Sequence, residues 1–228
     1  SNGALGQTMT MLRNVLEVCV ASNIRLVYPS GWEIYSGYAG DLYADETLPP
    51  HPLGPYAEAT VHAESMIRHF ADIHGLRCGL LRSSPVYGPQ SDRPKFIHNF
   101  MDKARRGETI RTHRYLNGAP ALDLMHVGDF VSALTQMCHA DCDQAINIGT
   151  GLMTSTPKIA HILVEMAGSK SAVEQVDVEA HTARIAMNVG KANRLLGWMP
   201  RISLEQGLEE IFHCDTQSEL NNCSSEGL

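Results

Sequence analysis

Two kinds of apolar segment alternate along this chain of 228 residues. Short continuous apolar runs are typical of strands buried on both faces, and they occur at residues 24–28 (IRLVY), 78–82 (CGLLR) and 145–149 (AINIG). Longer stretches space their apolar residues three and four positions apart, which predicts amphipathic helices. These helices are expected over residues 5–20, 56–74, 95–106 and 127–139, with two more beginning at Thr156 and at Ser203.

Turn and capping residues mark the ends of several predicted helices. Gly75 follows the last apolar position of its helix and is expected to end it. Thr156 and Pro157 are expected to be the cap and the first-turn proline of the helix that they open. Ser203 and Gln206, three residues apart, have the spacing of a capping box.

The segments between the apolar stretches are polar or rich in turn-forming residues. Residues 37–55 hold several glycines and prolines, and residues 107–126 are largely polar, so both are expected to be loops. The polar residues after Cys214 are expected to form a frayed tail. Apolar strands that alternate with helices longer than about ten residues predict an α/β fold, in which helices cover both faces of a parallel sheet.

The composition is that of a globular protein, with 43% hydrophobic and 19% charged residues. The formal net charge is −7 and no basic stripe occurs, which argues against duplex nucleic acid as a partner. No apolar run approaches the length of about 18 residues that predicts a membrane-spanning helix. Six cysteines without a CxxC pair indicate a reduced, cytoplasmic protein. No metal site is predicted, because His139 and Cys142 are too few ligands.

Six motifs occur in a fixed order along most of the chain. They are YPSGWEIYSG (28–37), Tyr56 opening a helix with Glu64 eight residues on, LLRSSPVYGP (80–89), DLMHVGDF (123–130), INIGTG (146–151) and NVGKANRLLGWMPRISLEQGLEEI (188–211). In this order they resemble the extended short-chain dehydrogenase/reductase family, the NAD-dependent epimerases and dehydratases that act on nucleotide sugars. The resemblance covers residues 5–212.

The resemblance implies an α/β fold: an incomplete Rossmann-like, doubly wound parallel sheet with a small C-terminal substrate-binding subdomain. Residues 1–90 would be the C-terminal half of the Rossmann-like domain. Residues 91–120 and 150–212 would form the substrate-binding subdomain, and 121–149 would return to the sheet. Residues 213–228 would be a disordered tail.

The chain departs from the family at its start. Family members begin with a strand, a glycine-rich turn and a helix that hold the dinucleotide pyrophosphate, whereas no GxxGxxG occurs among these 228 residues. The strand at 24–28 is therefore expected to lie at a sheet edge, covered by an upstream segment, a second chain or exchange between copies. NAD or NADP is expected as cofactor if the missing N-terminal half is supplied, and otherwise none.

Two of the three catalytic positions of the family are changed. Tyr56 matches the tyrosine that exchanges a proton with a substrate hydroxyl. The lysine expected four residues later is Thr60, which cannot lower the phenol pKa by its charge. The position of the orienting serine or threonine is Gly31. Ser30 is one residue earlier and would reach the site only through a local bulge, since neighbouring strand residues point to opposite faces. Tyr56, Ser30 and Thr60 are thus the catalytic candidates.

The resemblance also implies binding residues. Contacts to the cofactor are expected from Tyr28, Pro29, Ser30, Tyr56, Ser83, Pro85 and Val86. Substrate contacts are expected from Arg82, His126 and Arg184. Pro85 stands where the family often has an asparagine, and Leu122 where it has an arginine, so the substrate side has lost polar groups. Asp123, His126 and Asp129 are retained, with helix capping as the competing role.

These departures favour an NAD(P)-dependent nucleotide-sugar epimerase/dehydratase-like protein with impaired or absent catalysis. An active enzyme whose cofactor half lies outside this chain, a non-catalytic binding or scaffold relative, and a truncated fragment are the alternatives. The expected partners are a nucleotide sugar or another small molecule, and a second copy of the chain. A homodimer would pair the helices at 5–20 and 56–74, as relatives commonly do.

Overall fold

The structure, a computed structural model, describes residues 2–91 and 93–225. Its centre is a parallel sheet of three strands in the order β1-β3-β8 (Leu26–Gly31, Cys78–Ser83 and Ala145–Ile148). This confirms the predicted α/β fold with a parallel sheet. The first two strands pair without interruption from Leu26 opposite Cys78 to Gly31 opposite Ser83. The carboxyl ends of β1 and β3 therefore lie side by side.

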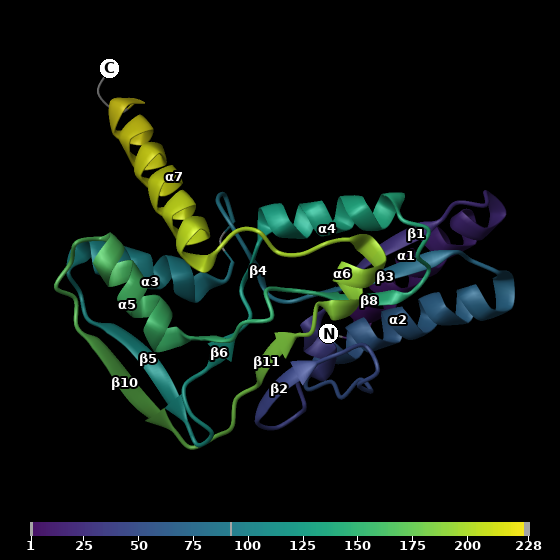
Figure 1. Cartoon of the computed structure of the whole chain (residues 1–228), viewed down its shortest axis with the longest axis horizontal. Coiled ribbons are helices and arrows are strands. Elements are labelled where there is room, and N and C mark those ends of the chain that lie inside the picture. Colours follow the sequence, from purple (N-terminus) through teal and green to yellow (C-terminus); the bar gives the residue numbers. More distant parts are fainter. Residues whose placement is uncertain (1, 92, 226–228) are drawn as a thin grey trace.

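Helices cover both faces of this sheet (Figure 1). One face carries α1 (Asn2–Ala21) and α2 (Pro55–His74), and the other carries α4 (Val127–His139) and α6 (Gly190–Leu196). Consecutive leucines of β3 show the alternation: Leu80 packs in the cluster with α1 and α2, and Leu81 in the cluster with α4 and α6. A run of apolar residues is needed because both faces of the strand are buried.

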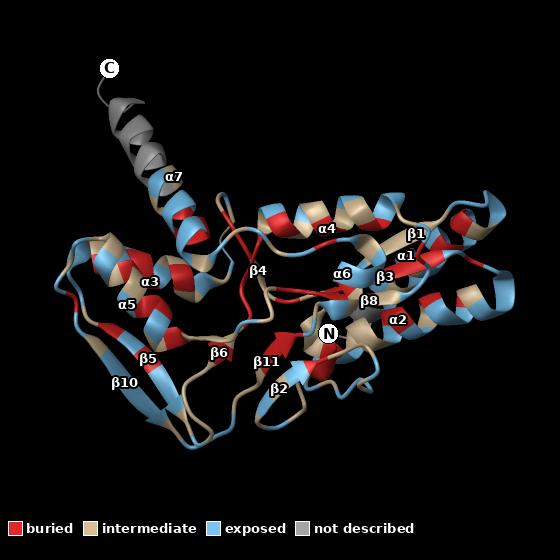
Figure 2. Cartoon of the chain, viewed as in Figure 1, coloured by how far each residue is buried: buried red, intermediate tan, exposed pale blue. Residues whose placement is uncertain are grey.

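A second group of elements has its own apolar core. It consists of α3 (Lys95–Arg106), β5 (Ile110–Tyr115), α5 (Thr156–Met166), β10 (Val173–Val178) and the start of α7 (Leu204–Ser225). Buried residues of this core include Ile97, Met101, Ile110, Leu163 and Leu208. β10 pairs in parallel with β5, and its outer side is exposed along most of its length (Figure 2). This is the segment in which a substrate-binding role was expected.

Short strands connect the two groups. One sheet has the order β2-β11-β6-β9 (Asp41–Ala44, Arg184–Met187, Ala121–Leu122 and Thr154–Ser155). A pair joins β4 (Val86–Tyr87) to β7 (Met125–His126), and a 3₁₀ turn, η1 (Trp32–Tyr35), follows β1.

Three local predictions need correction. The expected loop at 37–55 contains β2. The expected loop at 107–126 contains β5, β6 and β7. β2 and β5 pair with β11 and β10, which are distant in sequence, and short polar strands of this kind depend on tertiary partners rather than local pattern. The predicted frayed tail at 213–228 is instead helical through Ser225, because no proline or glycine lies between Leu208 and that residue. Residues 226–228 lie outside the described residues.

The third correction is by one residue. The N-cap of α5 is Ser155, whose hydroxyl accepts a hydrogen bond from Lys158 N, so Thr156 is the first helical residue and not the cap. The capping box of α7 is confirmed: Gln206 N donates to Ser203 Oγ, and Ser203 N donates to Gln206 Oε1. Gly75 ends α2 in the left-handed conformation, with φ of 67°, as its position predicted.

Candidate active-site cleft

A cleft of about 430 Å³ lies at the carboxyl ends of β1 and β3, beside the start of α2. Every residue that was expected to be catalytic or to bind the cofactor lines it: Tyr28, Pro29, Ser30, Tyr56, Thr60, Ser83, Pro85 and Val86. The uninterrupted pairing of β1 with β3 brings residues 28–30 next to Ser83 and the residues that follow it. The roles of these residues stay predictions, but the structure places them around one cavity.

Tyr56 lies at the mouth of this cleft in the first turn of α2. Gly54, with φ of 93°, makes the turn that a non-glycine residue would adopt only with strain, and Pro55 then opens the helix. The Tyr56 side chain is 73% exposed. Thr60 lies one turn along, and its hydroxyl donates to Tyr56 O at 3.0 Å. Thr60 is therefore bonded to the helix backbone and adds no charge beside the phenol.

A second phenol, Tyr28, lines the cleft from β1. Burial raises the pKa of Tyr28, with smaller contributions from Tyr56 and Glu64. The Tyr28 hydroxyl is thus a hydrogen-bond donor at neutral pH rather than a proton acceptor.

Ser30 borders the cleft, but its hydroxyl is held elsewhere. Ser30 Oγ donates to Glu64 Oε1 at 2.6 Å, and the residue is buried. The bulge that would turn this hydroxyl toward Tyr56 is absent, because β1 keeps a regular register with β3 through Gly31. The expectation that Ser30 replaces the orienting hydroxyl therefore lacks the backbone geometry that it needs.

Arg82, which was expected to contact substrate, is buried beneath the cleft and does not line it. Its Nε and Nη2 donate to the two carboxylate oxygens of Glu64 at 2.9 and 2.7 Å, and its Nη1 donates to Tyr35 Oη at 2.7 Å. Burial alone would raise the pKa of Glu64. The hydrogen bonds from Arg82 and Ser30 and the charges of Arg82 and Arg68 outweigh it and hold that pKa below its usual range. This pair ties α2 to the sheet.

The other two expected substrate residues also lie outside the cleft. His126 caps α4, with Nδ1 accepting from Gly128 N at 3.2 Å, and its Nε2 is 3.3 Å from a Glu210 oxygen. Arg184 pairs with Asp41 across β11 and β2, and it also donates to Ala119 O. Both side chains are occupied by contacts that hold the fold.

Two buried carboxylates near these residues are likewise structural. Asp123 accepts hydrogen bonds from Thr150 N and Oγ1 at 2.7 and 2.6 Å, and from the backbone of Gly151 and Met187. Asp129 accepts from the backbone N–H groups of Arg201 and Ile202. Each carboxylate therefore fixes a loop against the element that carries it.

Glu33 is a cleft residue that sequence reasoning missed. It lines the cleft from η1, and burial raises the pKa of its carboxyl group, partly offset by a backbone hydrogen bond. A Cβ added to Gly31 would overlap Glu33 Oε2 and lie 3.2 Å from the carboxyl carbon. The carboxylate thus fills the space that a side chain at residue 31 would need. The signal that could have identified Glu33 is an acidic residue two positions after Gly31, where the family has its orienting serine or threonine.

Among the described residues that line the cleft there is no lysine and no arginine. The polar side chains of these residues are two phenols, one carboxyl group, the indole of Trp32 and several hydroxyls. The cleft can exchange protons and donate hydrogen bonds, but it holds no cation that would stabilise a phenolate.

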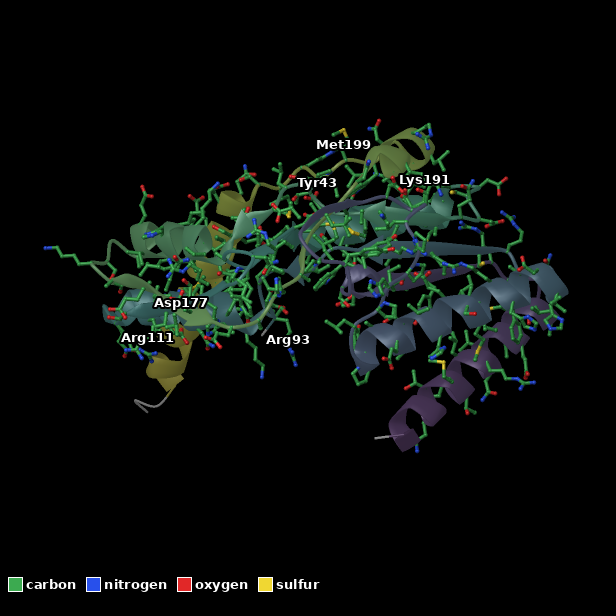
Figure 3. The ribbon with its side chains drawn as sticks, turned by 90° about the horizontal axis from the view of Figure 1, so that it is seen from below. Tyr43, Arg93, Arg111, Asp177, Lys191 and Met199 are labelled. Carbon is green, nitrogen blue, oxygen red and sulfur yellow. The ribbon has the colours of Figure 1, made fainter. Side chains whose placement is uncertain are left out.

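A second cleft, of about 590 Å³, lies between α3 and β5. Lys103, Arg106 and Arg111 line it together with Phe96 and other residues. Arg106 and Arg111 have exposed carboxylate partners in Glu108 and Glu174. Figure 3 shows Arg111 on the part of the molecule that carries β5 and β10, away from Lys191 of α6. Cations beside an aromatic ring suit a ligand that combines phosphate with a flat base.

In the described part of the chain, no three His, Cys, Asp or Glu residues are grouped so as to hold a metal ion. Over the same residues, no helix has both the length and the apolar character to cross a membrane.

Comparison with known proteins gives consistent matches. The model of the NAD dependent epimerase/dehydratase family matches residues 2–149. A putative UDP-glucose 4-epimerase of Methanocaldococcus jannaschii is 29% identical over 206 residues, which cover 88% of this chain and 66% of that protein. The mouse dTDP-D-glucose 4,6-dehydratase is 27% identical over 195 residues, covering 82% of this chain and 54% of the relative. The chain thus spans about half to two thirds of the length of these curated relatives.

Solved structures agree with the sequence matches. A UDP-glucose 4-epimerase of Thermotoga maritima, determined with UDP-glucose, superimposes with a TM-score of 0.78 at 27% identity, over 89% of this chain and 67% of that one. A dTDP-glucose 4,6-dehydratase of Bacillus anthracis, determined with NAD, gives a TM-score of 0.81 at 25% identity, over 91% of this chain and 67% of that one.

Proposed function

The chain belongs to the NAD-dependent epimerase/dehydratase family, and on that premise we propose that it is a nucleotide-sugar-binding protein whose own oxidation–reduction chemistry is strongly impaired. The observation that carries the proposal is the composition of the cleft at β1 and β3. Tyr56 is there, but the cleft has neither a cation nor a serine or threonine at residue 31.

The missing cation is the larger loss. A phenol has a pKa near 10, so at neutral pH it becomes an effective base only when a neighbouring positive charge stabilises the phenolate. Assistance by a general acid or base is worth about 10²- to 10⁴-fold in rate. Thr60, bonded to the backbone of its own helix, contributes no such charge. Proton transfer through Tyr56 alone should therefore be slow.

Glu33 gives the cleft a different capability. Because its pKa is raised by burial, its carboxyl group holds a proton at higher pH than a free carboxyl group does. It could donate that proton to a bound hydroxyl or accept one from it. The Glu33 carboxyl group therefore supports ligand binding by hydrogen bonds. Weak acid/base chemistry by the same group is what the competing proposal, an active enzyme, would require.

The residues of this cleft fit part of a dinucleotide cofactor. Tyr28, Pro29 and Ser83 to Val86 form a wall against which a flat nicotinamide ring could lie. The 228 residues hold no GxxGxxG turn for the pyrophosphate. We therefore expect NAD or NADP to bind well only where a phosphate-binding segment is supplied in addition to these residues, and otherwise not.

The α3–β5 cleft is the proposed site for the nucleotide part of the ligand. Lys103 would meet a diphosphate together with Arg106 and Arg111, which would exchange their contacts with Glu108 and Glu174 for it, while Asp102 in the same lining opposes the anion. Phe96 offers a ring on which a base could stack. The formal net charge of −7 and the five described cysteines without disulfides fit a cytoplasmic protein that does not bind nucleic acid.

A homodimer is proposed through α1 and α2. Three large apolar side chains of α1, Met11, Val15 and Val18, are exposed at a spacing of four and three residues, and Ile73 is exposed near the end of α2. Such a stripe on one helix face is expected to be covered by a partner. Pairing of these helices between two copies would bury it.

The test combines titration of ligands with measurement of turnover. Calorimetry of the purified chain should give saturable binding of UDP-glucose, weakened about tenfold by Lys103→Gln/Arg111→Gln and unchanged by Arg13→Gln on α1. NAD⁺ titrated alone should show weak binding or none.

Turnover of UDP-glucose with NAD⁺ should be the same in the unsubstituted chain and in Tyr56→Phe. A rate in the unsubstituted chain that falls more than about 100-fold in Tyr56→Phe would contradict impaired catalysis. Absence of UDP-glucose binding in the folded chain would contradict the binding role.

A further inference from the structure

A third cavity, of about 340 Å³, lies where the loop after β8, the first turn of α5 and the first turn of α7 meet. It has no lining residue in common with the cleft at β1 and β3 or with the α3–β5 cleft. Neither the catalytic candidates nor the expected substrate residues contribute to it. Its residues are therefore free to serve a different ligand.

Two cations line the cavity without an ion-pair partner among the described residues. They are Lys158 of α5 and Arg201, two residues before the cap of α7, and both are exposed. Among the described residues that line the cavity, Glu205 is the only acidic one. Three exposed arginines of this half of the molecule, Arg106, Arg111 and Arg114, do have carboxylate partners. The two unpaired cations favour an anion.

The walls of the cavity are held in place by buried groups. Asp123 fixes the Thr150 wall through hydrogen bonds of 2.7 and 2.6 Å, and Asp129 fixes the other wall through the backbone N–H groups of Arg201 and Ile202. Only the backbone of Arg201 is held, so its guanidinium group remains available for a ligand. A cavity with fixed walls costs less to order on binding than one that must form.

The rest of the lining is largely apolar. Leu124 is buried at the cavity, and Leu152, Ile202 and Leu204 add aliphatic surface. An anion without a hydrophobic part would leave this surface in contact with water. A ligand with a charged group and a ring-sized apolar body would cover it and meet both cations.

We propose that this cavity is a binding site for a small amphipathic anion, with its carboxylate or phosphate held by Lys158 and Arg201 and its apolar body against Leu124, Leu152 and Ile202. The site is separate from the proposed nucleotide-sugar clefts. The proposed anion site does not depend on the proposed function, because none of the residues that line the two nucleotide-sugar clefts contributes to it.

The test is titration of the whole chain with benzoate and with phenyl phosphate, followed by calorimetry or by amide chemical shifts. At least one probe should bind with a Kd of about 1 mM or below, and the tighter of the two identifies the charged group. Inorganic phosphate and benzyl alcohol, which each carry only one of the two features, should bind more weakly. The shifted amides should be those of Thr150 to Thr154 and Arg201 to Glu205.

Three variants decide whether the site is the proposed one. Lys158→Gln/Arg201→Gln should weaken binding of the better probe by about tenfold. Lys170→Gln/Arg194→Gln removes the same charge from two other exposed residues and should leave the affinity unchanged. Glu205→Gln should tighten binding about twofold, because it removes a negative charge from the lining.

The proposal is overturned if neither probe binds with a Kd of about 1 mM or below. It is also overturned if Lys158→Gln/Arg201→Gln weakens binding by no more than the control pair does. Because the four substituted cations are exposed, the variants should fold, and a far-ultraviolet circular dichroism spectrum checks this.

Discussion

The Glu33 carboxylate fills the space where a side chain on Gly31 would begin. A Cβ at residue 31 would overlap Glu33 Oε2 and lie 3.2 Å from the carboxyl carbon. The backbone of Gly31 is extended, with φ of −141°, so any residue could adopt its conformation. Glycine leaves room for the Glu33 carboxylate, which would have to turn aside if residue 31 carried a side chain. A serine at residue 31 and Glu33 in its present position exclude each other, which links the loss of one polar group to the presence of another.

The first prediction concerns the pH dependence of Glu33. Because burial raises its folded pKa above the ordinary value of 4.5, Glu33 contributes stability that is present at low pH and is lost as the pH rises through the folded pKa. Glu33→Gln cannot ionise. Relative to the unsubstituted chain, it should therefore gain stability as the pH rises above the ordinary value of 4.5, measured by urea unfolding. The exposed Glu179→Gln is the control and should show no such trend. A difference that stays constant as the pH rises contradicts the burial of Glu33.

The second prediction concerns the buried pair of Glu64 and Arg82, which are 1% and 3% exposed. Arg82→Met leaves the carboxylate buried beside Arg68 alone, and it should lower the free energy of unfolding by about 3–5 kcal/mol. Glu64→Leu/Arg82→Met should cost less than Arg82→Met, because no unpaired charge remains. Arg13→Met, which breaks the exposed pair with Glu17, should cost less than about 1 kcal/mol. Denaturant unfolding of the variants measures all three, and a double variant that costs as much as Arg82→Met or more would contradict the prediction.

The third prediction concerns Gly207 in α7. A Cβ there would overlap Tyr87 Oη and lie 2.8 Å from Tyr87 Cζ and 2.9 Å from His126 Cδ2. Both rings are buried and cannot move aside, so Gly207→Ala should destabilise the protein by about 1–3 kcal/mol despite the better helix propensity of alanine. Gly6→Ala in α1 is the matched control, since nothing lies within 4 Å of its Cβ. It should stabilise by about 0.5–1 kcal/mol. Thermal unfolding distinguishes the two signs.

The fourth prediction concerns the proposed dimer. Val18→Asp places a charge in the exposed apolar stripe of α1 and should convert the dimer to a monomer at micromolar concentration. Val131→Asp makes the same change at an exposed valine of α4 and should leave the mass unchanged. Sedimentation equilibrium gives both masses. A monomeric unsubstituted chain, or equal masses for the two variants, would falsify dimerisation through α1.

Local sequence signals were sufficient for the three central strands and for all the described α-helices except α6 (Gly190–Leu196), which was not predicted. The capping box of Ser203 and Gln206 and the left-handed Gly75 are set by residues within a few positions of each other. The short strands β2 and β5 were missed for the opposite reason. Their partners β11 and β10 come more than fifty residues later, so only the folded chain shows that these polar segments pair.

The candidate site divides in the same way. The sequence by itself determined which residues could gather at the strand ends, because parallel strands bring their carboxyl ends to one edge. It also determined that residue 60, a threonine, supplies no cation and that residue 31, a glycine, supplies no hydroxyl. Only the tertiary structure decided that Arg82 and Ser30 turn inward to Glu64 while Glu33 turns into the cleft. The physical reason is the cost of burial. A charge in the core must find an opposite charge, and that partner comes from another element, which local sequence does not specify.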